Sequence, residues 1–171
     1  MNARPDPWRN VPRVGLGLDT HVLVPGRPCR LGGVVLDSEV GPAGHSDGDV
    51  LLHALTDALL GGAGLDDLGT LFPDTAPRWK DADSGTFLEE ALERCRERGL
   101  RPLSADLVLV CDRPRIAPHR PLLRRALARR LDLPEDRVNL KGKTWEGRSE
   151  ASGLCQVQAV VLLGPDPETG A

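Results

Sequence analysis

The chain has 171 residues, 40% of them hydrophobic, which is enough to bury an ordinary core without disulfides or structural metals. Its 25 acidic and 22 basic residues give a net charge of −3, so the composition excludes a strongly basic nucleic-acid-binding protein. We therefore expect one domain over residues 1–171, with its core at about 13–163, frayed ends and no nucleic-acid partner.

The sequence indicates a cytoplasmic protein. The N-terminus lacks the apolar core of a signal peptide, and no apolar run approaches the length of a membrane span. The four cysteines are scattered without a Cys-x-x-Cys pair, which favours reduced thiols in an intracellular setting. No membrane partner is expected.

The first predicted strand begins near Val14 and ends in Asp19-Thr-His21. Alternate residues of a strand point to the same side, so Asp19 and His21 can converge on one point. Gly15 and Gly17 would let another backbone approach this strand closely. By itself the pair does not distinguish a metal site from an ordinary strand end.

A turn at Pro25-Gly26 leads to a second predicted strand, 31–36, which we expect to pair with the first as a hairpin. A polar loop over 37–48 then precedes a helix that Ser46 or Asp47 would cap. Apolar residues recur along this helix at helical spacing until the glycines at 61–64 end it.

Three polar residues of this helix, Asp49, His53 and Asp57, stand four positions apart and thus in one row. Such a row suits a metal-binding histidine whose second ring nitrogen is held by a carboxylate. A surface histidine with helix-stabilising acidic neighbours fits the same spacing. With Asp19 and His21, His53 would complete three ligands around an open position, as in catalytic zinc sites.

The remaining chain alternates polar turns with helices and strands. Residues 66–69 and 72–75 are expected to form short turns, and the arginine-rich 113–130 segment lacks the interleaved aromatics of a nucleic-acid site. The further elements predicted are helices at 84–98 and 119–131 and strands at 103–111, 138–144 and 154–163. This order predicts an α+β fold, a mixed sheet with helices on one side.

Four motifs occur in a fixed order along this chain: GLDTH (17–21), GHSDGDVLLHALTDALLG (44–61), LFPDT (71–75) and RPRIAPH (113–119). Together they resemble the 2-C-methyl-D-erythritol 2,4-cyclodiphosphate synthase family, the cyclising enzymes of the non-mevalonate isoprenoid pathway. The resemblance runs from about Arg13 to Leu163.

The resemblance implies an enzyme that closes 4-diphosphocytidyl-2-C-methyl-D-erythritol 2-phosphate into a cyclodiphosphate and releases CMP. It implies a homotrimer with sheets packed around a three-fold axis and active sites between subunits. Zinc would be held by Asp19, His21 and His53, and a second cation, Mg²⁺ or Mn²⁺, by Glu146. The family's transition-state contacts correspond to His45 and Thr144.

The family's binding pockets can also be carried over residue by residue. The methylerythritol phosphate pocket would be formed by Ser46, Asp67, Leu68, Gly69, Phe72, Pro73, Asp74, Thr75 and Ala76. The cytidine diphosphate would be held by Cys111, Asp112, Arg113, Pro114, Arg115, Ile116, Ala117, Lys143 and Trp145. Asp57 is interpreted as an outer residue that supports a metal ligand.

The sequence departs from the family pattern at 141–153. A threonine-rich run is replaced by Lys-Gly-Lys-Thr-Trp before Glu146. The usual aromatic residue is absent, and the family's phosphate-binding arginine has no clear counterpart other than Arg148. Two other functions therefore stay open: a zinc phosphoesterase that uses water as nucleophile, and a non-catalytic trimeric homologue with weak nucleotide binding.

Overall fold

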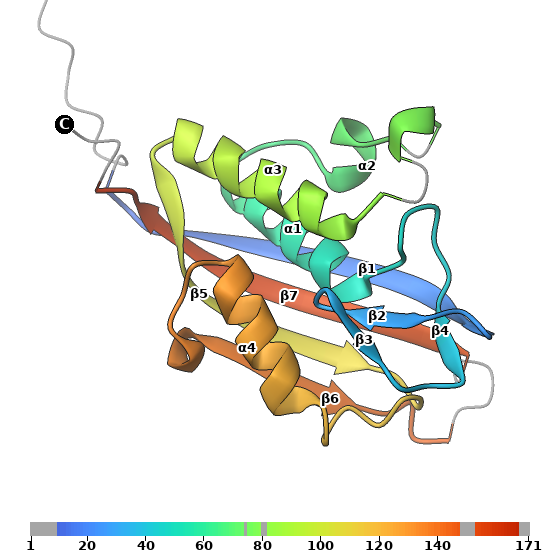
Figure 1. The fold of residues 1–171 in the computed structure, drawn as a ribbon. Helices are drawn as coiled ribbons and strands as arrows, with labels where there is room; N and C mark the ends of the chain where they lie inside the picture. Colours follow the sequence, from blue (N-terminus) through green and yellow to red (C-terminus); the bar gives the residue numbers. More distant parts are fainter. Residues whose placement is uncertain (1–9, 74, 80–81, 148–152, 168–171) are drawn as a thin grey trace, which may run out of the picture.

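The computed structural model describes residues 10–73, 75–79, 82–147 and 153–167 (Figure 1). Its centre is a five-stranded sheet in the order β4-β1-β7-β5-β6, in which β5 and β6 are parallel and all other neighbours antiparallel. The strands are β1 (Arg13–Pro25), β4 (Val40–Pro42), β5 (Leu100–Val110), β6 (Val138–Lys143) and β7 (Leu154–Pro165).

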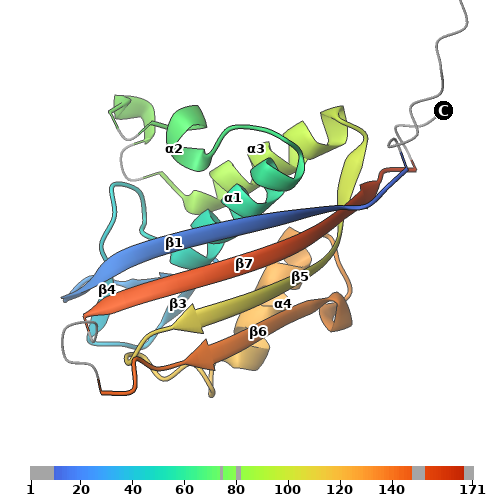
Figure 2. The ribbon, with the colours of Figure 1, turned by 180° about the vertical axis from the view of Figure 1, so that it is seen from behind.

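Helices cover one face of this sheet, and the view from behind shows strands without a covering layer (Figure 2). The predicted α+β fold, a mixed sheet with helices on one side, is thereby confirmed. The three long helices are α1 (Val50–Gly62), α3 (Ser84–Glu97) and α4 (Arg120–Arg130). The short ones are α2 (Leu68–Leu71) and the 3-10 turns η1 (Pro77–Trp79) and η2 (Glu135–Arg137). Among the described residues, no helix is both long and apolar enough to cross a membrane.

The predicted hairpin between the first strand and residues 31–36 is wrong. Those residues form a hairpin of their own, β2 (Cys29–Leu31) with β3 (Val34–Leu36), while β1 pairs with β4 and β7. The reason lies in Gly32 and Gly33, whose φ angles of 62° and 78° close a two-residue turn inside the predicted strand.

The predicted cap of the central helix is also wrong, because the N-cap residue of α1 is Asp49 rather than Ser46 or Asp47. The Asp49 carboxylate accepts a hydrogen bond from Leu52 N at 3.2 Å, and also from Gly32 N at 2.8 Å and Gly33 N at 2.6 Å. The side chain is fully buried, and burial raises its pKa. One carboxylate therefore joins the β2–β3 turn to the start of α1.

The helix α1 packs very closely against the strand β1. A Cβ atom added to Gly15 would lie 1.7 Å from Ala58 O, and one added to Gly17 would lie 1.9 Å from Ala54 O. Both distances are far below van der Waals contact, so only glycine allows the helix to lie directly on the strand. The close approach expected of these two glycines is confirmed.

The two faces of β1 have different compositions. Its odd-numbered residues face α1, starting with the two glycines and continuing to Asp19 and His21. Its even-numbered residues lie on the uncovered face and include the large, exposed side chains of Val14, Leu16, Leu18 and Val22. One strand thus presents polar site residues on one side and an apolar stripe on the other.

Replacement of Gly17 tests the close approach. We expect Gly17→Ala to lower the free energy of unfolding by about 1–3 kcal/mol, the usual cost of overpacking, because the backbone of α1 must move away from the new methyl group. Gly153→Ala is a matched control, since a Cβ atom there meets nothing within 4 Å. Denaturant unfolding at one fixed protein concentration compares the two variants; equal stabilities would contradict the packing described.

Candidate active site

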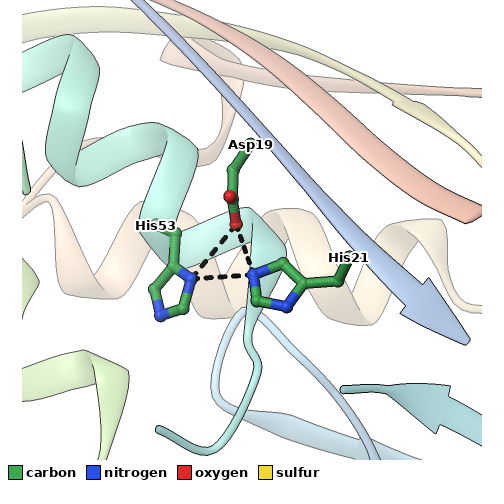
Figure 3. A group of neighbouring side chains, drawn as sticks. All are labelled: Asp19, His21 and His53. Carbon is green, nitrogen blue, oxygen red and sulfur yellow. Dashed lines mark hydrogen bonds and ion pairs between the residues drawn. The ribbon is translucent and has the colours of Figure 1, made fainter. Parts of the chain in front are cut away.

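Asp19, His21 and His53 meet where the second half of β1 passes the first turn of α1 (Figure 3). Asp19 Oδ2 lies 2.8 Å from His21 Nε2 and 3.1 Å from His53 Nδ1, and the two nitrogens are 3.2 Å apart. Two ligands of a tetrahedral zinc ion, each about 2.0–2.1 Å from the metal, are about 3.3 Å apart. The spacing of the three atoms therefore fits a zinc ion with little rearrangement.

Each of the two imidazoles directs only one ring nitrogen toward this centre. The other nitrogen of His21, Nδ1, makes a short hydrogen bond with the carbonyl oxygen of Ala43. A carbonyl oxygen only accepts, so Nδ1 carries the hydrogen and Nε2 directs its lone pair at the centre. The other nitrogen of His53, Nε2, lies 2.8 Å from Ser84 Oγ and 3.1 Å from Ser46 Oγ.

The charges of the site also favour a cation. Burial raises the pKa of the Asp19 carboxyl, but the adjacent imidazoles of His21 and His53 outweigh burial and hold that pKa well below its usual range. Asp19 is therefore a carboxylate at neutral pH. Burial lowers the pKa of His21, yet the hydrogen bond to Asp19 raises it overall, so protons compete with a metal for this ring as the pH falls.

The row of Asp49, His53 and Asp57 has three separate roles in the structure. Asp49 caps the helix, and the Asp57 carboxylate accepts a hydrogen bond from Leu68 N at 2.8 Å, at the start of α2. The second ring nitrogen of His53, where the sequence suggested a carboxylate, faces Ser84 instead. Whether Asp57 affects metal binding stays a prediction.

A cavity of about 310 Å³ adjoins the two histidines. Besides these two histidines, five predicted site residues line it: His45, Ser46, Leu68, Gly69 and Phe72. Asp67 lies at the N-terminus of α2, where its carboxylate accepts from Thr70 N; Pro73, Thr75 and Ala76 follow the helix. Asp74 lies outside the described residues.

Aromatic side chains form one wall of this cavity. Trp79 and Phe87, which sequence reasoning missed, line it together with Phe72. The ring centroid of Phe72 lies 5.4 Å from that of Trp79 and 5.0 Å from that of Phe87. No motif singled them out, because they come from η1 and α3 and meet α2 only through tertiary packing.

A second cavity, of about 450 Å³, lies at the ends of β5 and β6. Its lining includes most of the residues predicted to hold the nucleotide and the second cation: Cys111, Asp112, Arg115, Ile116, Ala117, Lys143, Thr144 and Glu146, together with Gly142 and Arg120, which the sequence did not suggest. The segments 111–117 and 142–146 thus converge although they are far apart in the sequence, because β5 and β6 are parallel neighbours.

Three predicted nucleotide residues lie beside the second cavity rather than in its lining. Trp145 N donates to Asp112 Oδ1 at 3.0 Å, and Trp145 Nε1 donates to Leu154 O at 3.0 Å. Arg113 is exposed, with Glu39 at 3.9 Å, and Pro114 follows it in the chain. Trp145 therefore ties the loop after β6 to the segment after β5. Arg148 lies outside the described residues.

Residues 12–164 match the family model of the YgbB family. The chain belongs to this family. The family identified from the four motifs is thereby confirmed, because the curated relatives carry the name 2-C-methyl-D-erythritol 2,4-cyclodiphosphate synthase.

Two of these relatives share about half of their residues with the chain. A synthase of Thermus thermophilus is 54% identical over 151 residues, covering 88% of this chain and 98% of the relative. The synthase of Aquifex aeolicus is 48% identical over 151 residues, covering 88% of this chain and 97% of the relative.

Solved structures of family members have the same fold. A synthase structure with CDP bound has a TM-score of 0.84 and 50% identity, covering 88% of this chain and 99% of that one. The CDP complex of IspF from Plasmodium falciparum has a TM-score of 0.79 and 29% identity, covering 92% of this chain and 98% of that one.

Proposed function

We propose that this protein converts 4-diphosphocytidyl-2-C-methyl-D-erythritol 2-phosphate into 2-C-methyl-D-erythritol 2,4-cyclodiphosphate and CMP, as a phosphorus–oxygen lyase of the non-mevalonate isoprenoid pathway. Family membership and relatives at 48–54% identity support this assignment. The observation that carries it is the convergence of Asp19, His21 and His53 beside a cavity that the family's own substrate motifs line.

The reaction requires the protein to position the phosphate groups of the substrate and to neutralise their charge. The 2-phosphate oxygen of the substrate attacks the β-phosphorus of its own diphosphate, the bond from that phosphorus to the α-phosphate oxygen breaks, and CMP leaves. The nucleophile is already an anion, so no strong general base is needed. Holding both phosphates at attack distance and balancing their charge supplies the acceleration.

Asp19, His21 and His53 would hold zinc, and Glu146 would hold Mg²⁺ or Mn²⁺. When bound, such ions polarise phosphoryl oxygens and stabilise charge on the transferring group. The residues at the two proposed metal sites match these ions, because imidazoles suit zinc and a carboxylate suits a hard cation that also binds phosphate oxygens.

The remaining site residues would bind and orient the substrate. His45 lies exposed at the first cavity, where its ring would contact a phosphate, while Ser46, Leu68 and Gly69 would border the methylerythritol. Thr144 donates to Glu146 Oε1 at 2.8 Å, and both residues line the second cavity together with Lys143. Glu146 has a φ of 52°, a left-handed conformation that is uncommon for residues other than glycine.

A homotrimer would complete the site. The uncovered face of β1 carries exposed Leu16 and Leu18, 67% and 52% accessible, and β7 adds Val160, so this face has an apolar surface to bury. The two cavities share no lining residue among those described, which suits a site built from the metal side of one subunit and the nucleotide side of the next.

The trimer can be tested on the apolar face. We expect sedimentation velocity to give three 18.4 kDa chains for the wild type and smaller species for Leu16→Lys, because each lysine would bury a charge at the axis. Leu122→Lys, at a residue of similar character on the helical side, is the control and should leave the trimer intact. A monomeric wild type would contradict the proposal.

Product analysis tests the reaction itself. Purified protein given zinc, Mg²⁺ and the diphosphocytidyl substrate should yield CMP and the cyclodiphosphate in equal amounts, as followed by ³¹P NMR. His53→Ala should lose the activity and its zinc, because one of three ligands is gone. Release of inorganic phosphate without the cyclic product would indicate a phosphoesterase, and no turnover would indicate a non-catalytic homologue.

The unusual segment after β6 leads to a prediction about nucleotide binding. Without the family's phosphate-binding arginine, CDP affinity should depend steeply on Mg²⁺ or Mn²⁺, since the cation must neutralise the diphosphate. In calorimetric titrations, Glu146→Gln should remove most of that dependence, whereas Arg148→Ala should change affinity little. A large loss in Arg148→Ala would show that Arg148 replaces the missing contact.

A further inference from the structure

A chain of hydrogen bonds leads from the partly buried Asp47 through Ser84 to the buried His53. Ser84 is the first residue of α3 and is fully buried. Its hydroxyl makes a short hydrogen bond to Asp47 Oδ1, and its backbone N donates to Asp47 Oδ2 at 3.3 Å. The same hydroxyl oxygen lies 2.8 Å from His53 Nε2.

The surroundings of Asp47 determine the direction of these hydrogen bonds. Every other partner of its carboxylate among the described residues is a donor: Asp49 N at 3.1 Å, the Ser84 backbone N, and Arg30 Nε at 3.5 Å. An ionised carboxylate only accepts, so the Ser84 hydroxyl must donate its single hydrogen to Asp47. The oxygen of Ser84 then offers only lone pairs to His53.

These hydrogen-bond directions also determine which ring nitrogen of His53 carries the hydrogen. Because Ser84 Oγ accepts, His53 Nε2 must carry the ring hydrogen, and Nδ1 is left with a lone pair. That lone pair points to the place where Asp19 Oδ2 and His21 Nε2 converge. The tautomer opposite to that of His21 is therefore selected, although both rings serve one centre.

We propose that Ser84, oriented by Asp47, is a positioning residue that fixes His53 as the Nε2–H tautomer and so determines that His53 binds metal through Nδ1. The proposal rests on the metal-binding role proposed above for Asp19, His21 and His53, and not on the identity of the reaction. It assigns to Ser84 the outer contact that the sequence suggested for Asp57.

Ser46 does not account for the tautomer equally well. Its hydroxyl lies 3.1 Å from His53 Nε2, but its other side-chain partners are Gly48 N, a donor, and the Ser84 hydroxyl, each at 3.5 Å. No acceptor-only group among the described residues determines where its hydrogen points. Ser46 can therefore bond to either tautomer, whereas Ser84 fits only one.

The direct test is the ring tautomer in metal-free protein. With ¹⁵N-labelled histidine at mildly alkaline pH, long-range ¹H–¹⁵N spectra distinguish protonated from unprotonated ring nitrogens for the four histidines. We expect hydrogen on Nε2 of His53 and on Nδ1 of His21, whose partner is the Ala43 carbonyl. Because both rings are seen in one spectrum, His21 is an internal reference. A His53 ring with hydrogen on Nδ1 overturns the proposal.

Variants extend the test to metal binding. Ser84→Ala should lose the tautomer preference of His53 and weaken zinc binding by about 10–100-fold, the usual effect of removing an outer partner of a ligand. Ser84→Thr, which keeps the hydroxyl, should restore both. Asp57→Asn should leave the His53 ring signals unchanged.

The outcomes separate this proposal from the proposed reaction. Unchanged ring signals and zinc affinity in a folded Ser84→Ala variant overturn the role of Ser84, whatever the enzyme does. If Ser84→Ala does not fold, the wild-type spectrum still decides. The expected tautomers without cyclodiphosphate formation would uphold the role of Ser84 and contradict only the proposed reaction.

Discussion

The fold depends on the direct contact between α1 and β1. At Gly15 and Gly17 the strand has no side chain beneath the helix, so the helical backbone lies on the strand itself. The same face of the strand then presents Asp19 and His21 two and four residues further on. A helix held at a larger distance would carry His53 away from them. The site is therefore a consequence of strand alternation combined with close packing.

The surroundings of the site fix the orientation of both histidine rings. The Ala43 carbonyl accepts a hydrogen bond from the His21 ring, and Ser84 contacts the His53 ring. Asp49 links the β2–β3 turn to α1, the helix that contains His53. Ligands that are ordered in advance lose little entropy when a cation binds, and they keep their lone pairs directed at it. The outer contacts come from three different segments, which is why only the assembled fold provides them.

The sequence predicted those features that depend on local pattern. Strand alternation placed Asp19 beside His21, the motifs identified the family, and the glycines indicated close packing. Several other contacts between distant segments were missed or misassigned. Residues 31–36 were predicted as one strand because two glycines within an apolar run resemble a strand interior. Asp57 was predicted as the partner of His53 because helical spacing can be recognised in the sequence, whereas the contact of His53 with Ser84 joins distant segments. Trp79, Phe87 and Arg120 reach the cavities only through tertiary packing.

X-ray diffraction at the zinc absorption edge, on crystals of the protein as purified, is the most direct test of this account. We expect one anomalous peak per chain, from a zinc ion bound to Asp19 Oδ2, His21 Nε2 and His53 Nδ1, with a fourth coordination position open to the neighbouring cavity. A zinc ion bound through His53 Nε2, or zinc located away from these three residues, would contradict it.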